Sequence, residues 1–200
     1  MLSYNILKSD GLPNWEKTGK IPIDKVLWTD NTDIKAYAQL FCGTDRLFVH
    51  LHADEKHIRA EGEGLLDEPC LDSCLEFFLS PVDKDLRYIN IEMNPNCCLY
   101  FGIGTGRGDL VRILLPGGAQ TLNANCRRKS DFWDLYYELP FSLIRLFFPN
   151  FKAEGSMRGN FYKCGELTEH KHYIAWNSVE CETPDFHRPE YFGELLFKTK

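Results

Sequence analysis

Two glutamates lie in neighbouring apolar segments and could do chemistry together. Glu76 belongs to the run Ser73 to Leu79, and Glu92 belongs to the run Leu86 to Met93. Hydrolysis of a glycosidic bond needs two carboxyl groups at a fixed separation, which glutamates on adjacent strands could supply. The same carboxyl groups could instead accept hydrogen bonds from a bound sugar. Spacing alone leaves open whether both side chains share a face, and we favour binding over hydrolysis.

Two histidine pairs raise the possibility of a metal site. His50 and His52 are two residues apart, as are His170 and His172, and this spacing places each pair on one face of a strand. Imidazole nitrogens bind transition metals, so a metal-dependent enzyme is an alternative interpretation. Neither pair has a nearby Asp or Glu in a recognised order. The chain also lacks a Gly-x-Ser-x-Gly motif, and its eight cysteines form no Cys-x-x-Cys pair.

Further candidate ligand-binding residues lie toward the C-terminus. Arg158, Asn160 and Tyr162 share one face of a predicted strand because side chains alternate along a strand. A proline-flanked loop rich in polar and aromatic groups follows later, and loops at the ends of sandwiches commonly carry function. From this loop we include His187, Arg188 and Tyr191. Trp176 completes the set, although a large ring on a strand more often anchors the core.

The elements that must position these residues are predicted to be strands. Aromatic residues make up 14% of the chain and occur in short runs with β-branched neighbours, bounded by Gly, Asn, Asp and Pro. This pattern predicts an all-β fold, a two-sheet antiparallel β-sandwich of immunoglobulin or jelly-roll type, in one domain spanning residues 1–200. One or two short helices are expected. The predicted strands are 34–41, 46–53, 73–79, 86–93, 98–103, 110–114, 132–139, 159–164, 172–176 and 193–197.

Two connections have specific signals. Cys42 to Asp45 predicts a tight hairpin in which Gly43 takes the positive φ that such turns need. Pro140 to Leu146 predicts a short helix with the proline near its first turn, where a missing N–H costs nothing.

The strand from Ser73 to Leu79 is apolar on both faces. Leu75, Phe77 and Leu79 point one way with Ser73, whereas Cys74, Glu76 and Phe78 point the other way. A strand of this kind is covered on each side. Glu76 is then a part-buried carboxylate, which is costly unless a partner or ligand compensates.

The same strand carries a family resemblance. Asp72-Ser73-Cys74-Leu75-Glu76-Phe77-Phe78-Leu79 resembles the "D-S-x-x-E-F-F-L" strand of family 9 carbohydrate-binding modules, specifically the family-9-like domains related to the DOMON sandwich. Other pieces are similar to that family's following segments, in the same order, between about Trp15 and Phe197. These pieces are Tyr88–Asn94, Trp133 with Leu139–Phe141, Gly159–Cys164, and Trp176 with Asp185–Gly193.

The resemblance implies a β-sandwich that clamps a terminal sugar between two aromatic rings beside a carboxylate. Carried over by position, Glu76 matches the carboxylate, and Phe186 falls near one clamp position. The other clamp position falls near Cys70, which cannot stack, so the chain departs from the two-tryptophan clamp. Calcium stabilises some family members, but no Asp-rich loop here indicates a calcium site.

Composition limits the possible partners. The formal net charge of −6 repels phosphate backbones and anionic lipid, so we expect neither nucleic acid nor membrane as a partner. The basic run 127–129 is short and is predicted to be a solvated turn. No secretory signal is visible at the start, which predicts a cytoplasmic protein, or a secreted one if the chain was trimmed. The cysteines are predicted to be buried thiols, as in a reducing compartment.

We therefore predict non-catalytic binding of a mono- or oligosaccharide, by aromatic stacking and carboxylate hydrogen bonds, without a cofactor. The ligand is expected to lie against Glu76, Phe186, His187 and the strand bearing Asn160 and Tyr162. A metal-dependent or glycosidase-type enzyme, or a partner-binding domain with a degenerate cleft, are the alternatives. The identity of the sugar and the oligomeric state do not follow from the sequence.

Overall fold

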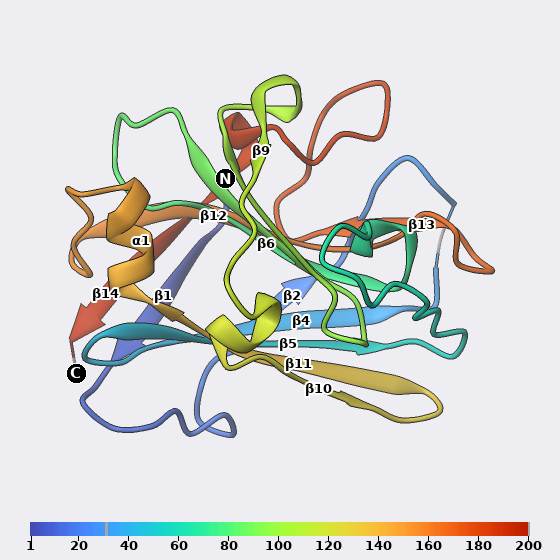
Figure 1. The fold of residues 1–200 in the computed structure, drawn as a ribbon, viewed down its shortest axis with the longest axis horizontal. Coiled ribbons are helices and arrows are strands. Elements are labelled where there is room, and N and C mark those ends of the chain that lie inside the picture. Colours follow the sequence, from blue (N-terminus) through green and yellow to red (C-terminus); the bar gives the residue numbers. More distant parts are fainter. Residues whose placement is uncertain (31, 200) are drawn as a thin grey trace.

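The strands of the chain are joined edge to edge into one curled sheet (Figure 1). We describe a computed structural model that places residues 1–30 and 32–199. The strands are β1 Ser3–Lys8, β2 Ile21–Ile23, β3 Lys25–Val26, β4 Lys35–Cys42, β5 Arg46–Asp54, β6 Cys74–Ser80, β7 Tyr88–Met93, β8 Leu99–Gly104, β9 Val111–Arg112, β10 Asn125–Arg128, β11 Phe132–Pro140, β12 Ser156–Gly165, β13 His172–Ala175 and β14 Gly193–Thr199. The helix α1 spans Phe141–Phe147, and 3-10 turns span Pro69–Leu71, Arg107–Asp109, Gly118–Leu122 and Pro189–Tyr191.

The main path of the sheet is β10-β11-β5-β4-β1-β14-β12-β6-β7-β8-β9, with β2, β3 and β13 paired off this path. The all-β prediction is confirmed, but the prediction of a purely antiparallel fold is wrong. β1 lies between β14 and β4 and pairs in parallel with both. The strands also form one hydrogen-bonded sheet rather than two. It curls so that β5 packs against β6, which produces a layered, sandwich-like interior.

Strand β6 lies at the centre of the molecule, and both its faces are buried. Leu75, Phe77 and Leu79 belong to the larger hydrophobic core, where Phe77 stacks on Phe161 with ring centroids 4.4 Å apart. Cys74 and Phe78 belong to a second core on the opposite face of the sheet. The predicted alternation and double coverage of this strand are therefore confirmed. Glu76 consequently faces the second core.

The predicted hairpin and helix are both present, with one correction. The amide of Gly43 donates to the Arg46 carbonyl at 2.9 Å, which closes the turn between β4 and β5. Gly43 does not have the predicted positive φ. Its missing side chain matters for space instead, because a Cβ there would lie 2.8 Å from Cε2 of Phe48. In α1, Pro140 is the N-cap residue, and Phe141 and Ile144 anchor the helix in the core.

Strands β1, β2, β3 and β10 were not predicted. They are short or flank partners that are distant in sequence, so their local patterns carry little signal. The basic run 127–129, predicted to be a solvated turn, begins within β10. Arg127 there pairs with the carboxylate of Asp134 on β11, its neighbour in the sheet.

A buried ion pair links β12 to the end of β5. The Lys163 side chain is fully buried, and its Nζ lies 3.2 Å from Oε2 of Glu55. Glu55 also accepts hydrogen bonds from Nε1 of Trp133 at 3.0 Å and from the Ser73 hydroxyl at 2.8 Å. Nζ of Lys163 lies 2.6 Å from Nε2 of His172. Burial and the Lys163 charge lower the pKa of His172 to about 4, so this imidazole is neutral at physiological pH.

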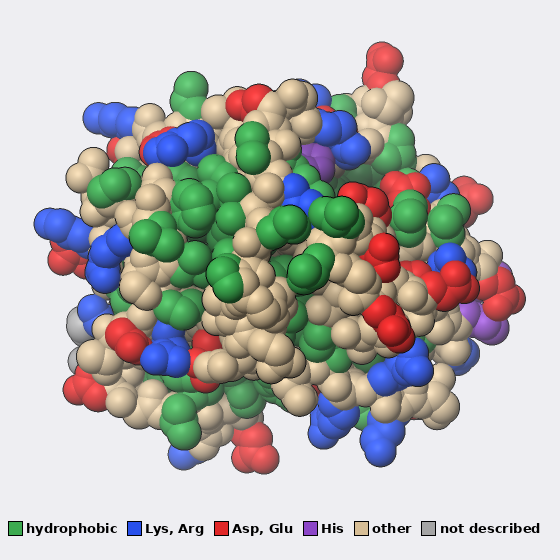
Figure 2. All heavy atoms as spheres, in the orientation of Figure 1, with side chains coloured by type: hydrophobic (Ala, Val, Ile, Leu, Met, Phe, Trp, Pro, Cys, Tyr) green, Lys and Arg blue, Asp and Glu red, His purple; other side chains and the backbone are tan. Residues whose placement is uncertain are grey.

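The surface mixes charge of both signs with apolar groups. On the face in Figure 2, acidic and basic side chains intermingle around the edge, and hydrophobic side chains gather toward the centre. Exposed apolar residues of the molecule include Leu86, Val111, Leu114 and Leu146. In the part of the chain that the structure describes, no helix has the length and apolarity needed to cross a membrane.

Candidate functional site

A small pocket of about 70 Å³ opens over the second core, on the face of the sheet to which Glu76 points. Strands β6 and β7 supply Glu76 and Glu92, and β12 and β13 supply one wall. The 3-10 turn before β6 and the loops after β3, β8, β12 and β13 supply the rest. The lining residues are Trp28, Cys70, Glu76, Glu92, Arg107, Cys164, Glu166, Tyr173, Pro184, Asp185, Phe186 and His187.

Glu76 and Glu92 lie opposite each other in the pocket. They are direct cross-strand partners of the antiparallel pair β6 and β7, so their side chains project from the same face. This register settles the point that spacing left open. Glu76 is 2% exposed and Glu92 is 6% exposed. The Cys164 thiol donates to Oε1 of Glu76 at 3.0 Å, and the Asn90 amide donates to Oε1 of Glu92 at 2.7 Å.

Burial of two like carboxyl groups side by side changes their titration. Desolvation, followed by the charge of Glu92, raises the pKa of Glu76 well above its ordinary value. Desolvation also raises the pKa of Glu92 to about 7, although the hydrogen bond from Asn90 opposes the shift. Two such groups do not both ionise readily near neutral pH. The pair then carries a carboxylic acid beside a carboxylate, which offers both a hydrogen-bond donor and an acceptor.

Aromatic rings form the wall beside the carboxylates. Phe186 stacks on Tyr162, with ring centroids 4.1 Å apart and an interplanar angle of 13°. On the pocket side, Trp28 lies 5.5 Å from Phe186 and 5.7 Å from Tyr173, centroid to centroid. Nε1 of Trp28 donates to the Cys181 carbonyl at 2.7 Å, which orients the ring. Trp28 has a φ of 55°, a left-handed conformation that non-glycine residues seldom adopt and that recurs at ligand clamps.

The rim of the pocket is polar. Nε of Arg107 pairs with Oδ1 of Asp185 at 3.0 Å, and both side chains reach solvent. Nδ1 of His187 is hydrogen-bonded to the Tyr88 hydroxyl at 2.8 Å. Burial and the nearby Arg107 charge lower the pKa of His187 to about 4. This imidazole is therefore neutral above that pH.

Four of the predicted ligand-binding residues line this pocket, namely Glu76, Glu92, Phe186 and His187. Both positions that the resemblance assigned to the sugar clamp, Cys70 and Phe186, also face it. Tyr162 does not reach the pocket but supports it from behind, by stacking on Phe186 and by donating to the Phe186 carbonyl at 3.1 Å.

The other five predicted residues lie elsewhere, and their assignment as ligand contacts stays a prediction. Asn160 is fully buried and its amide donates to the Asn177 carbonyl at 2.9 Å, while Trp176 packs in the larger core. Arg158 donates to the carbonyls of Glu190 and Phe192. Arg188 pairs with Glu190, and the Tyr191 hydroxyl donates to the Glu180 carbonyl.

Sequence reasoning missed Trp28, Arg107, Glu166 and Tyr173. Trp28 had a usable signal, because a large aromatic residue in a polar segment, here followed by Thr-Asp-Asn-Thr-Asp, often marks a binding site. Arg107 lies in the glycine-rich segment after β8, which resembles an ordinary flexible hairpin. Only folding brings that segment to the pocket.

A larger surface concavity, of about 720 Å³, lies beside Arg158. It is lined by Met1, Ser80, Val82, Asp83, Lys84, Asp85, Leu86, Ser156, Met157, Arg158, Pro189, Glu190 and Glu194. No aromatic side chain is among these described residues, whereas sugar faces bind well to aromatic faces. The small pocket is therefore the better candidate despite its size.

Comparisons with known proteins identify the family of the chain. The model of carbohydrate-binding family 9 matches residues 8–197, almost the whole chain. The chain belongs to carbohydrate-binding family 9. No curated protein gave a significant match.

Solved structures support the family 9 fold. A proposed carbohydrate-binding protein from Bacteroides uniformis is 24% identical, with a TM-score of 0.81 over 98% of this chain and 99% of that one. A family 9 module from Caldicellulosiruptor kristjanssonii, solved with cellotriose, is 12% identical, with a TM-score of 0.67 over 98% and 95% of the two chains. A family 9 module from the same organism, solved with glucose, is 13% identical, with a TM-score of 0.65 over 98% of this chain and 97% of that one. At these identities the likeness establishes the fold.

Proposed function

We propose that this family 9 chain binds the terminal residue of a saccharide in the pocket between Glu76, Glu92, Trp28 and Phe186. The observation that carries the proposal is the placement of two paired carboxyl groups beneath aromatic rings in one pocket. Sugars present apolar C–H faces and a rim of hydroxyls, and this pocket offers a partner for each. Two structural neighbours were solved with cellotriose and with glucose, which makes glucose and cello-oligosaccharides the first ligands to test.

A carboxyl pair that holds both a carboxylic acid and a carboxylate suits sugar hydroxyls. Each hydroxyl both donates and accepts, so a carboxylate and a neighbouring carboxylic acid can bind two hydroxyls in complementary ways. Hydrogen bonds to an ionised carboxylate are stronger than neutral ones. Since Glu76 accepts only a weak thiol hydrogen bond from Cys164 among the described residues, a sugar hydroxyl would supply a stronger partner.

The pocket volume favours the end of a saccharide over its middle. Sites for small ligands usually enclose about 300–1,000 Å³, far above the 70 Å³ found here. Part of one sugar residue enters this space, and a full ring requires the Trp28 side chain to move outward. Trp28 sits on a loop and is only half-buried, so it is the wall best able to yield.

The same volume argues against hydrolysis. A glycosidase holds sugar residues on both sides of the bond that it cleaves, with its two carboxyl groups flanking that bond. A pocket of 70 Å³ does not hold two residues. We therefore propose binding without catalysis.

Calorimetric titration with glucose, cellobiose, cellotriose and a wider panel of saccharides tests the proposal. Trp28→Ala should weaken binding of the best ligand about tenfold to a hundredfold, the loss typical of a buried aromatic contact. Trp15→Ala is the matched control, because Trp15 is also half-buried but lies outside the pocket. A panel in which no sugar binds, or equal losses in both variants, would contradict the proposal.

Glu76→Gln keeps the shape of the side chain and removes one ionisable carboxyl group from the pair. We expect about a tenfold or greater loss of affinity, since the charge-assisted hydrogen bonds that such a pair offers contribute roughly 1.5–3 kcal/mol each. Arg158→Ala, in the larger concavity, should leave affinity unchanged. If instead Arg158→Ala weakened binding and Glu76→Gln did not, the ligand would be assigned to that concavity. Release of reducing ends from any bound oligosaccharide, abolished in Glu76→Gln, would show a glycosidase instead.

A further inference from the structure

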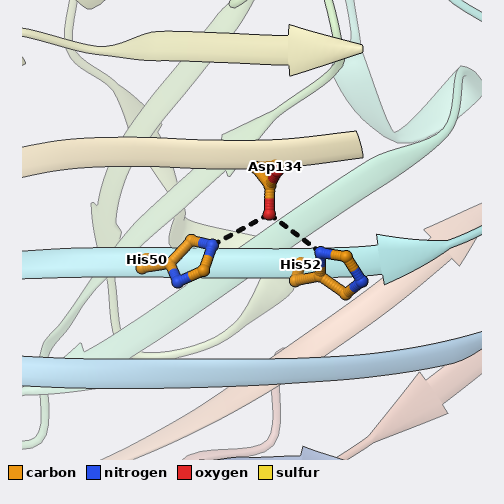
Figure 3. A group of neighbouring side chains, drawn as sticks. All are labelled: His50, His52 and Asp134. Atoms are coloured by element: carbon orange, nitrogen blue, oxygen red, sulfur yellow. Dashed lines mark hydrogen bonds and ion pairs between the residues drawn. The ribbon is translucent and has the colours of Figure 1, made fainter. Parts of the chain in front are cut away.

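A second polar cluster lies on strands β5 and β11, and it shares no residue with the sugar pocket. His52 and Asp134 are direct cross-strand partners, and His50 lies two residues before His52 on the same face. Figure 3 shows both imidazole rings turned toward one carboxylate oxygen. Nε2 of His50 lies 3.0 Å from Oδ1 of Asp134, and Nδ1 of His52 lies 2.8 Å from the same atom. The acidic partner that the sequence did not reveal is therefore supplied by a neighbouring strand.

The far nitrogen of each ring has an acceptor beside it. The Gln39 amide nitrogen donates to the carbonyls of Trp15 and Thr18, so its oxygen must face Nδ1 of His50, 2.8 Å away. Nδ1 of His50 consequently carries the proton. Nε2 of His52 lies 3.2 Å from Oδ1 of Asp54, an acceptor to which this nitrogen donates when it carries the proton.

With these tautomers of the two neutral imidazoles, the two remaining nitrogens have lone pairs, and both are aimed at a carboxylate oxygen that has lone pairs of its own. Such an arrangement is repulsive unless two protons or one cation lie between the three atoms. Two protons would create two adjacent imidazolium ions beside Arg127. The ring nitrogens that carry these protons would lie within 4.8 Å of each other. His50 is 4% exposed, and burial disfavours a charged imidazole. A divalent cation supplies the same charge without forming two buried imidazolium ions.

We propose that His50, His52 and Asp134 form a binding site for a divalent transition metal ion, with Zn²⁺ as the best-suited ion. Two imidazole nitrogens and one carboxylate oxygen are a common ligand set for such ions. Gln39 and Asp54 act as the outer partners that typically hold metal-binding histidines in the right tautomer. Glu55, at the end of the same strand, belongs instead to the buried ion pair with Lys163.

The cluster is also held rigidly. The His50 ring stacks on Tyr136 at 4.2 Å with an interplanar angle of 6°, and the His52 ring stacks on Tyr37 at 4.7 Å. Nε of Arg127 donates to the other carboxylate oxygen of Asp134 at 2.9 Å, which keeps Oδ1 turned toward the histidines. Pre-organised ligands lose little freedom when a metal binds. The bound ion would tie β5 to β11.

The other histidine groups lack these features. His172 is buried against Lys163, whereas His170 is exposed, so the second predicted pair does not converge. His57, Glu169 and His170 lie close together, but all three are exposed. This exposed group serves as an internal control for loose metal binding at the surface.

The test uses untagged protein stripped with a chelator and titrated with Zn²⁺ by calorimetry. We expect one tightly bound ion per chain and a rise in melting temperature as Zn²⁺ is added. His52→Ala should weaken binding by at least about a hundredfold, and Asp54→Ala, which changes only an outer partner, by about tenfold. The double variant His57→Ala/His170→Ala should bind as the parent protein does, and sugar affinity of His52→Ala should be unchanged.

Co²⁺ gives a second measurement that requires no variant. Its visible absorption in the parent protein should show nitrogen and oxygen ligands at one equivalent. The proposal is overturned if neither Zn²⁺ nor Co²⁺ binds stoichiometrically, which would leave a metal-free charge network. It is also overturned if the ion is lost in His57→Ala/His170→Ala and retained in His52→Ala.

Discussion

Lys163→Met is expected to lower the free energy of unfolding by about 3–5 kcal/mol, because it leaves Glu55 charged and buried without its cation. Lys163 is fully buried, and Glu55 lies at the centre of a network that also includes Trp133 and Ser73. Methionine fills a similar volume, so the loss reports the charge rather than a cavity. Urea denaturation, followed by circular dichroism, measures it.

The exposed pair Lys152 and Glu154 provides the control. Its atoms are 3.4 Å apart and its side chains are 75% and 69% exposed. Lys152→Met should therefore change the free energy of unfolding by less than about 1 kcal/mol. The double variant Lys163→Met/Glu55→Leu should recover part of the loss, since replacing both partners removes the unpaired charge. Equal effects at Lys163 and Lys152 would show that the buried ion pair is not needed.

Between acidic and neutral pH, the free energy of unfolding is expected to fall less in Glu92→Gln than in the parent protein. The pKa of Glu92 is raised from an ordinary 4.5 to about 7 in the folded protein. Below pH 4.5 the group is protonated in both states and its contribution to stability is fully present. As pH rises, the unfolded chain releases the proton first, so stability falls until about pH 7. Each unit of pKa is worth about 1.4 kcal/mol, so the total is about 3 kcal/mol.

Denaturant unfolding between pH 4.5 and 7 measures the difference in free energy of unfolding between the variant and the parent protein. The free energy of unfolding of Glu92→Gln should rise relative to that of the parent as pH rises. The reason is that glutamine does not ionise, so no negative charge develops beside Glu76. The charged groups that act on Glu92 are Glu68, Arg107 and Arg112, and the Asn90 amide donates a hydrogen bond to it. Glu154→Gln, at an exposed site, should follow the parent at every pH. A constant difference between Glu92→Gln and the parent would show that Glu92 titrates normally.

Some features of the site were predictable because they depend on local pattern. The alternation along β6 predicted that Glu76 faces a covered surface, and the structure confirms that it is buried. Family-like residues placed Phe186 and Cys70 at the two clamp positions, and both line the pocket. Asn160 shows the limit of the same logic. It shares a strand face with Tyr162, yet both side chains are fully buried and neither lines the pocket.

What the sequence by itself determined is the β-rich fold, the central strand β6 with its buried carboxylate, and membership of a sugar-binding family. These follow from side-chain alternation and short motifs, which are local. The tertiary structure decided the strand register that sets Glu92 opposite Glu76, the arrival of Trp28 at the pocket, and the meeting of Asp134 with His50 and His52. Each of these contacts joins segments distant in the chain, and pairing between distant strands depends on the packing of the whole sheet.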